Sequence, residues 1–277
     1  MPSPITDVQW QTVRTSLKHT ADRFAELVLA REPGAKATQD WTVADTAAHV
    51  AVIARLYTAQ IGSGAATDPL PSLRSTVLTT TVDTVSDLNA AALAQFTERD
   101  TGAIIEQLRA DIDVILRVSD GLDPEEPLPW LGDSRVPRAG VLAHLVNELL
   151  IHGWDIGRWR IPPEDAALFH DLFLVGLLRH DPGHLLDNDE PPREKRIAVQ
   201  FRSDHTKPVT LVLHRGKVTV EDPRADNDVR LRFDPPTLSL VNFHRVAKAR
   251  AVLTGKIAIS GPKPWLLPRF LKTVRLP

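Results

Sequence analysis

The chain contains no cysteine among its 277 residues. This excludes structural disulfides, thiolate metal ligands and a cysteine nucleophile, so any reactive sulfur has to come from another molecule. Neither sign of charge dominates, because the formal net charge is −2 and the isoelectric point is about 6.6. We therefore expect no electrostatic capture of nucleic acid or of an anionic membrane.

Long apolar runs are also missing. No stretch approaches the length needed to cross a bilayer, and the first twenty residues lack a basic region followed by an apolar core, so we expect no signal peptide. The hydrophobic content of 43% and charged content of 25% are typical of a globular protein. We expect a cytoplasmic protein with small-molecule partners. A monomer and a homodimer both fit the sequence.

The first part of the chain reads as helices. Thr42 followed by Asp45 is a capping-box pattern that starts one of them, and Pro137 suits the first turn of another. Loops are predicted at 62–72 and in the proline-rich stretch 123–137. The spacing of apolar residues predicts helices over about 7–32, 42–62, 82–121 (two patterns, broken at 99–102) and 137–159.

The composition of the sequence changes after a connecting helix that is predicted over 166–179. A polar linker at 182–195, rich in proline and acidic residues, follows this helix. Beyond it, a glycine turn in "HRGK" joins two of several short β-rich segments. The prediction is strands at 196–202, 208–214, 217–222, 228–234 and 256–260, and helices at 235–255 and 264–274. We therefore expect a four-helix bundle over 1–165, a connecting helix and linker over 166–189, and a small α+β domain over 190–277.

The segment "HLVNELLIHGWDIGRW" carries His144, Glu148, His152 and Asp155 at spacings of four, four and three. At about 100° per residue, these four side chains share a stripe about 80° wide on a helix. Apolar residues cover most of the remaining circumference, which predicts a buried helix. A buried carboxylate is unfavourable unless it is paired or bound to a cation. Inward-facing imidazole and carboxylate groups are how helix bundles build metal sites.

Glu148 and His152, one turn apart, can bind one ion, and a third ligand has to come from another helix. His49 is the best candidate, because the residues around it in "AAHVA" are small or apolar, as expected on an inward face. Two histidines and one carboxylate are typical of a catalytic zinc with an open position. The same three ligands also describe a facial-triad iron site.

Interpretations without a metal stay open for each ligand. Glu148 with His144 or His152 also fits a buried hydrogen-bonded pair, and His49 fits a satisfied core histidine. His144 itself fits a supporting role beside the ligands, a position facing the substrate, or simple packing.

Two acidic residues are candidates for supporting roles. Asp155 fits a partner that orients His152 from outside the ligand set, or a surface residue near the end of its helix. Asp45 fits either a helix cap or a partner of His49.

The segments "WTVADTAAHVAVIARLY" and "VPRAGVLAHLVNELLIHGWDIGRW" resemble the DinB-like bundle of mycothiol-dependent maleylpyruvate isomerases and related mycothiol S-transferases. That family has a tryptophan–threonine helix start, a histidine one to two turns later, and Glu-x-x-x-His on the last bundle helix. The resemblance implies that His49, Glu148 and His152 bind a divalent metal, usually zinc.

The segment "LVNFHRVAKARAVLTGKIAISGP" is similar to the closing segment of the sterol-carrier-protein-like domains that this family often appends. His244 replaces the usual glycine before the arginine, and the usual proline is lost. The resemblance implies a catalytic role for Arg245, since an arginine of this domain is thought to reach the active site. The matching positions are Arg245, Ala251 or its neighbour Ala249, Gly255 and Lys256.

The resemblance also implies a metal-dependent isomerase or S-transferase that uses mycothiol on a small, electrophilic and acidic substrate. A cation favours the thiolate form of a bound thiol, which would attack an electrophilic carbon. Addition to an activated double bond, rotation and elimination would give isomerisation, whereas a stable adduct would be the product of transfer. Arg245 would hold a substrate carboxylate.

Three other functions fit the residues. A non-haem iron enzyme would use the same ligands. An apolar-ligand-binding protein would hold its ligand in the C-terminal domain and keep a structural metal in the bundle. A metal-free interaction module would need the polar stripe to be a buried ion-pair network.

Overall fold

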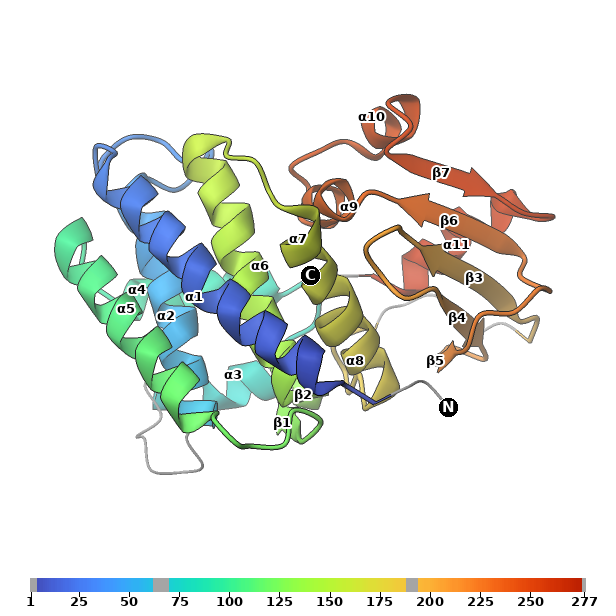
Figure 1. Ribbon diagram of the computed structural model, residues 1–277, viewed down its shortest axis with the longest axis horizontal. Coiled ribbons are helices and arrows are strands. Elements are labelled where there is room, and N and C mark those ends of the chain that lie inside the picture. The colour runs from blue at the N-terminus through green and yellow to red at the C-terminus, as the bar shows by residue number, and fades with distance from the viewer. Residues whose placement is uncertain (1–3, 62–69, 188–193, 276–277) are drawn as a thin grey trace.

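The computed structural model describes residues 4–61, 70–187 and 194–275. A helical part and an α+β part lie side by side (Figure 1). The predicted loop at 62–72 and the predicted linker at 182–195 fall partly outside the described residues, as do the first residues of the chain. In the part that is described, no helix is long and apolar enough to cross a membrane.

Four long helices form the first part: α1 (Asp7–Leu29), α2 (Val43–Ile61), α5 (Thr101–Val118) and α6 (Arg138–Gly157). Each of α1 and α2 packs against both α5 and α6, which closes the bundle (Figure 1). The predicted four-helix bundle is confirmed. The expected capping box at the start of α2 is also present, since Thr42 and Asp45 exchange backbone–side-chain hydrogen bonds of 3.1 Å.

Helix α6 is buried on nearly every side, as its sequence predicts. One reason that it can be surrounded is Gly140. A Cβ atom at this position would lie 2.6 Å from the backbone oxygen of Leu172, on the helix that packs across α6. The missing side chain therefore allows the two helices to approach closely.

Gly140→Ala should lower the free energy of unfolding by about 1–3 kcal/mol, because a backbone oxygen cannot move aside as a side chain can. The matched control is Gly157→Ala on the same helix, where the added Cβ would meet only the flexible end of Leu27. Urea unfolding of both variants measures the difference. Equal stabilities would show that the approach at Gly140 is not tight.

Smaller elements lie around the bundle. Helix α4 (Val85–Gln95) was predicted, whereas the short helix α3 (Arg74–Thr79) was not. The predicted loop at 123–137 contains a two-stranded hairpin, β1 (Pro127–Pro129) with β2 (Arg135–Pro137). Proline argues against strands, and these strands escape that rule because they are three residues long and pair only with each other.

A helix over residues 163–179 joins the two parts. It consists of α7 (Pro163–Leu168), a π-helical turn (Phe169–Leu174) and α8 (Val175–Arg179). The π-helical turn contributes Phe169 and Phe173 to the core of the bundle, whereas Val175 and Leu178 belong to the core beneath the sheet. Because this helix serves both cores, the division at residue 165 stays a prediction.

The second part is an α+β domain with a five-stranded mixed sheet in the order β5-β4-β3-β6-β7, and the predicted α+β class is confirmed. Among the strand pairs of the described residues, only β3 and β6 run parallel. Arg215 and Gly216 both have positive φ in the predicted turn between β4 and β5. The strands are β3 (Ile197–Arg202), β4 (Val209–His214), β5 (Lys217–Glu221), β6 (Val229–Phe233) and β7 (Ile257–Ser260).

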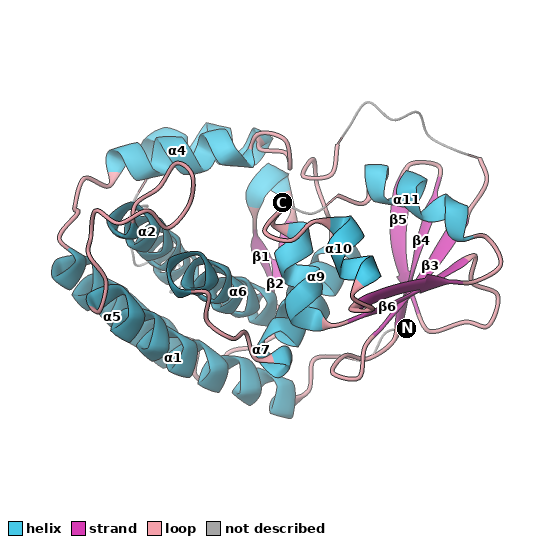
Figure 2. Cartoon of the chain, turned by 90° about the horizontal axis from the view of Figure 1, so that it is seen from above, coloured by secondary structure: helices cyan, strands magenta, loops and turns pink. Residues whose placement is uncertain are grey.

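The prediction of one continuous helix over 235–255 is wrong. Helix α9 (Pro235–Asn242) ends in a turn where His244 has a φ of 60°, and α10 (Lys248–Leu253) begins only after it. Helix α11 (Leu267–Thr273) follows near the end of the chain, and Figure 2 shows α9 between the bundle and the sheet. Arg245 therefore lies in a turn and not on a helix. Its backbone N–H donates to Leu240.

His244 occupies the place where the resembled pattern has glycine. Its positive φ explains that preference, because glycine adopts the left-handed region without steric cost while histidine does so less readily. The turn after α9 therefore forms here with histidine in a conformation that suits glycine better.

Candidate metal centre

His49 on α2 and Glu148 and His152 on α6 converge in the interior of the bundle. One ligand atom from each lies within 4.8 Å of the other two. Glu148 Oε2 is 3.4 Å from His49 Nε2 and also 3.4 Å from His152 Nε2. All three side chains are buried, with at most 7% of any residue exposed. The expected meeting of two helices at these three residues is therefore observed.

The spacing suits a small divalent cation. Ligand bonds of about 2.0–2.1 Å in tetrahedral geometry place neighbouring donor atoms about 3.4 Å apart, the separation of Glu148 Oε2 from each imidazole nitrogen. Two imidazoles and one carboxylate leave at least one coordination position for another molecule. Across the described segments, this is the one group of histidine and acidic side chains with such spacing.

The charges of the centre also favour a cation. Burial raises the pKa of Glu148, but hydrogen bonds from His152 and His49 outweigh burial and hold this pKa well below its usual value. Burial lowers the pKa of His49, which leaves that imidazole neutral. Burial acts in the same direction on His152, yet hydrogen bonds to Asp155 and Glu148 raise its pKa above the usual value. A buried ionised carboxylate thus faces imidazole nitrogens, where a metal ion would replace the proton on His152.

Asp155 holds the outer side of His152. Its Oδ2 lies 3.1 Å from His152 Nδ1, and the residue is 7% exposed. Burial raises the pKa of Asp155, but hydrogen bonds with His152 and Arg245 lower it below the usual value. Because the ionised carboxylate can only accept, His152 donates from Nδ1, which leaves Nε2 as the nitrogen that would bind a metal in place of a proton.

Arg245 of the second domain forms an ion pair with Asp155, the residue that contacts His152. Its Nε donates to Asp155 Oδ1 at 3.1 Å and its Nη2 donates to Oδ2 at 2.7 Å. Its Nη1 donates to the backbone oxygen of Phe243 at 2.7 Å. The turn after α9 therefore places a two-pronged ion pair between the domains, next to the outer side of His152.

His144 lies beside the ligands on the same stripe. Its Nδ1 is 2.9 Å from the hydroxyl of Tyr57, and its Nε2 is 3.5 Å from Glu148 Oε1. The rings of Trp130 and Phe173 each lie 4.8 Å from the imidazole, measured between ring centroids. Burial lowers the pKa of His144 to about 4. The imidazole is therefore neutral at physiological pH.

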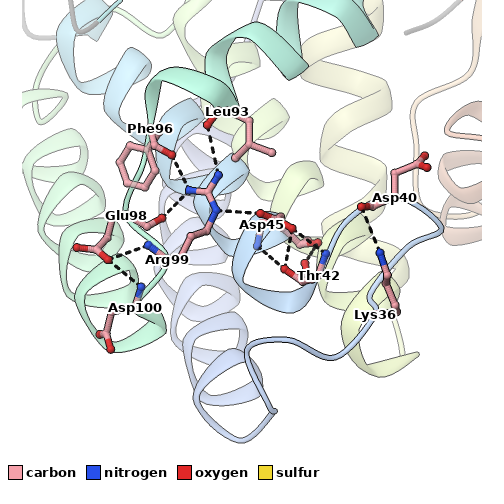
Figure 3. Close-up of polar contacts among 10 residues, drawn as sticks. Lys36, Asp40, Thr42, Asp45, Leu93, Phe96, Glu98, Arg99 and Asp100 are labelled. Carbon is pink, nitrogen blue, oxygen red and sulfur yellow. Dashed lines mark hydrogen bonds and ion pairs between the residues drawn. The ribbon is translucent and has the colours of Figure 1, made fainter.

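Asp45 fixes the start of α2. Its Oδ2 accepts from the hydroxyl of Thr42 at 2.7 Å, and its Oδ1 accepts from Arg99 Nε at 2.8 Å (Figure 3). None of its hydrogen bonds within the described residues reaches His49. Of the two predicted roles, the geometry matches the helix cap, which ties α2 to the segment between α4 and α5.

Two aromatic residues at the centre were not identified from the sequence. Trp41 lies just before α2, with ring centroids 4.8 Å from His49 and 6.0 Å from His152. Tyr57 follows His49 by eight residues on α2, about two helical turns. The tryptophan of the helix start was a usable signal for the first, whereas the sequence held no comparable signal for the second.

The family model named "Mycothiol maleylpyruvate isomerase N-terminal domain" matches residues 13–157 of this chain. The match runs from within α1 to the end of α6 and includes all three candidate ligands. No curated protein matches the chain.

Among solved structures, the crystal structure of a mycothiol-dependent maleylpyruvate isomerase is similar, with a TM-score of 0.50 and 12% identity. The match covers 90% of this chain and 92% of that one, so the shared fold extends over both domains. A histidine-to-alanine mutant of that enzyme gives a TM-score of 0.47 at 11% identity, over 90% and 92% of the two chains. The sec-alkylsulfatase Pisa1 from Pseudomonas sp. gives 0.28 at 11% identity, over 82% of this chain and 32% of that one. These two lower scores support no inference.

Proposed function

Since this chain belongs to the mycothiol maleylpyruvate isomerase N-terminal domain family, we propose that it is a metal-dependent enzyme that uses a low-molecular-weight thiol. The thiol is mycothiol, and the metal is a divalent ion, most simply zinc. The reaction is isomerisation of, or S-transfer to, a small electrophilic and acidic substrate.

The observation that carries the proposal is the buried group of His49, Glu148 and His152. An acidic side chain placed this deep between imidazoles is unfavourable unless a cation or a proton compensates it. Their nitrogen and oxygen donors fit zinc, with a position left open for a ligand from outside. The absence of cysteine from the chain means that a sulfur in that position would belong to a cosubstrate.

A bound divalent ion would supply positive charge that favours the thiolate form of a thiol. The protein's own part is to hold the ligands. Asp155 accepts from Nδ1 of His152, which leaves Nε2 as the nitrogen that would bind the metal. Burial keeps His49 neutral and able to bind. Each of the three ligand residues is buried, with at most 7% of its surface exposed.

The side chain of Arg245 supports the proposal that the substrate is acidic. A guanidinium group has five N–H donors, and three of them donate to Asp155 and Phe243 in the described structure. The others can hold a substrate carboxylate, because the Arg245 side chain is 26% exposed. The ion pair of Arg245 with Asp155 joins the second domain to α6.

The test is an activity assay of the full chain with maleylpyruvate and with other acidic electrophiles, each with and without mycothiol. We expect isomerised product or an S-conjugate only when both the metal and the thiol are present. Treatment with a chelator should reduce the rate to background, and added zinc should restore it. Mass spectrometry of the products separates isomerisation from transfer.

Two results would overturn this proposal. Oxygen-dependent turnover that requires iron and no thiol would identify a non-haem iron enzyme. A copurifying apolar ligand, together with no thiol-dependent turnover of any acidic electrophile, would identify a binding protein.

A further inference from the structure

We propose that Tyr57 and His144 are positioning residues that aim the carboxylate of Glu148 at the metal centre. Tyr57 fixes the proton of the His144 imidazole on Nε2, and that N–H holds one oxygen of Glu148 so that the other faces His49 and His152. This inference rests on the metal centre of the proposed function and adds the device that orients its only carboxylate ligand.

The two oxygens of Glu148 have different surroundings. Oε2 lies 3.4 Å from the Nε2 atoms of both His49 and His152, which places it among the candidate ligand atoms. Oε1 lies 3.5 Å from His144 Nε2. Oε2 is thus the oxygen placed to bind a cation, and Oε1 is the oxygen that faces His144.

The chemistry of donors and acceptors fixes the direction of the hydrogen bonds from Tyr57 through His144 to Glu148. An ionised carboxylate only accepts, so a neutral His144 can interact favourably with it only by carrying its proton on Nε2. The Nδ1 atom is then an acceptor, and the hydroxyl of Tyr57, 2.9 Å away, must donate to it. The order Tyr57 to His144 to Glu148 follows, with every proton pointing towards the carboxylate.

Packing against aromatic rings holds Tyr57 and His144 in place. The imidazole of His144 contacts the rings of Trp130, Phe169 and Phe173, with centroid separations between 4.8 and 6.0 Å. Tyr57 is 4% exposed and its own ring lies 5.3 Å from Trp130. The aromatic surroundings offer little competition for the two ring nitrogens, so the hydroxyl of Tyr57 selects the tautomer.

Loss of this hydroxyl has a defined consequence. Without a donor at Nδ1, the proton of His144 can move to that atom, which turns the lone pair of Nε2 towards the negative oxygen of Glu148. The carboxylate is then repelled on the side that held it. Partners that orient a metal ligand typically contribute 10–100-fold to metal affinity or activity.

The first experiment measures the zinc affinity of the full chain by competition with a chromophoric chelator. We expect Tyr57→Phe to weaken affinity about 3–10-fold and His144→Leu to weaken it about 10–100-fold. His144→Gln should stay within about 3-fold of the parent, because its amide N–H₂ can still donate to Glu148. The matched control Thr58→Val removes a hydroxyl from the next residue of α2, which donates to Ala54 and not to the centre, and should leave affinity unchanged.

Comparing the zinc affinities of His144→Leu and His144→Gln distinguishes a positioning role from a packing role. A packing role predicts that leucine, an apolar residue of similar size, is tolerated better than glutamine. Affinity retained in His144→Leu but lost in His144→Gln, or unchanged in Tyr57→Phe, would overturn the proposal. A parent protein that binds no zinc would instead overturn the proposed function.

A second measurement does not depend on the metal. Nitrogen-15 NMR of histidine-labelled, metal-free protein reports which ring nitrogen of His144 carries the proton, and the signals are assigned by their loss in His144→Gln. We expect the parent to hold the proton on Nε2 and Tyr57→Phe to show a mixture of the two tautomers. A parent with the proton on Nδ1, or no change in Tyr57→Phe, would overturn the role of Tyr57. Because Tyr57 is the only tyrosine of the chain, no other phenol complicates the comparison.

Discussion

Replacing His152 by alanine will abolish metal binding while the bundle stays folded. His152 supplies one of only three candidate ligands, and its Nε2 lies 3.4 Å from Glu148. With two ligands left, the centre falls below the number that zinc sites in proteins use. Elemental analysis of the purified proteins should give about one metal per chain for the parent and close to none for the variant.

The fold should survive this change, because the neighbours of His152 keep other partners. Asp155 retains both hydrogen bonds from Arg245, and Glu148 retains His49 and His144. We expect an unchanged circular dichroism spectrum and a loss of about 1–3 kcal/mol in the free energy of unfolding of the metal-free protein.

The matched control is His184→Ala. His184 has the same i, i+3 hydrogen bond to an aspartate as His152 does, at 2.9 Å to Asp187, but its side chain is 66% exposed. This variant should keep the full metal content. Equal metal content in His152→Ala and the parent would contradict the assignment of the ligands.

Asp155→Asn is expected to have the second largest effect. The carboxylate accepts from His152 Nδ1 and binds Arg245 through both oxygens. An amide of the same shape has no charge and one acceptor fewer, so it can serve only one of these partners well. Zinc affinity should fall about 10–100-fold, since the proton on Nδ1 of His152 is no longer fixed.

The same change should weaken the link between the domains, because Arg245 is the second domain's partner in this ion pair. The control is Asp171→Asn, which alters another aspartate–histidine contact, with His170 at 2.9 Å, on the helix that joins the domains. Zinc affinity should be unchanged in this control. An Asp155→Asn protein with the affinity of the parent would show that Asp155 does not orient His152.

The sequence predicts most of the centre because most of it lies on one helix. The spacing of Glu148, His152 and Asp155 defines a stripe that depends only on helical geometry, and the apolar residues around the stripe predict its burial. His49 could be chosen because small residues flank it on a separately predicted helix. These predictions needed no knowledge of how the helices pack.

The role of Tyr57 was not predicted from the sequence, because it depends on how the helices pack. Its hydroxyl meets His144 only because α2 and α6 lie side by side at that level, which periodicity within either helix does not reveal. The position of Arg245 in a turn was not predicted for another reason. The residue before it, His244, has a left-handed conformation that the sequence pattern did not predict, and this breaks the expected helix and turns Arg245 towards Asp155.

The fold divides in a similar way. Short β-rich segments predict the strands, but the order in which β3 lies between β4 and β6 depends on contacts between distant segments. The hairpin β1–β2 contradicts the local preference of its prolines. The π-helical turn at Phe169–Leu174 is likewise invisible to a pattern of apolar residues, yet it places Phe169 and Phe173 beside His144.

X-ray absorption spectroscopy at the edge of the bound metal, before and after addition of mycothiol, tests the central claim most directly. We predict nitrogen and oxygen neighbours at about 2.0–2.2 Å in the protein alone, and one added sulfur neighbour at about 2.3 Å when the thiol is present. A protein without bound metal, or a set of neighbours that does not change when the thiol is added, would contradict the claim that these three side chains hold a cation open to sulfur.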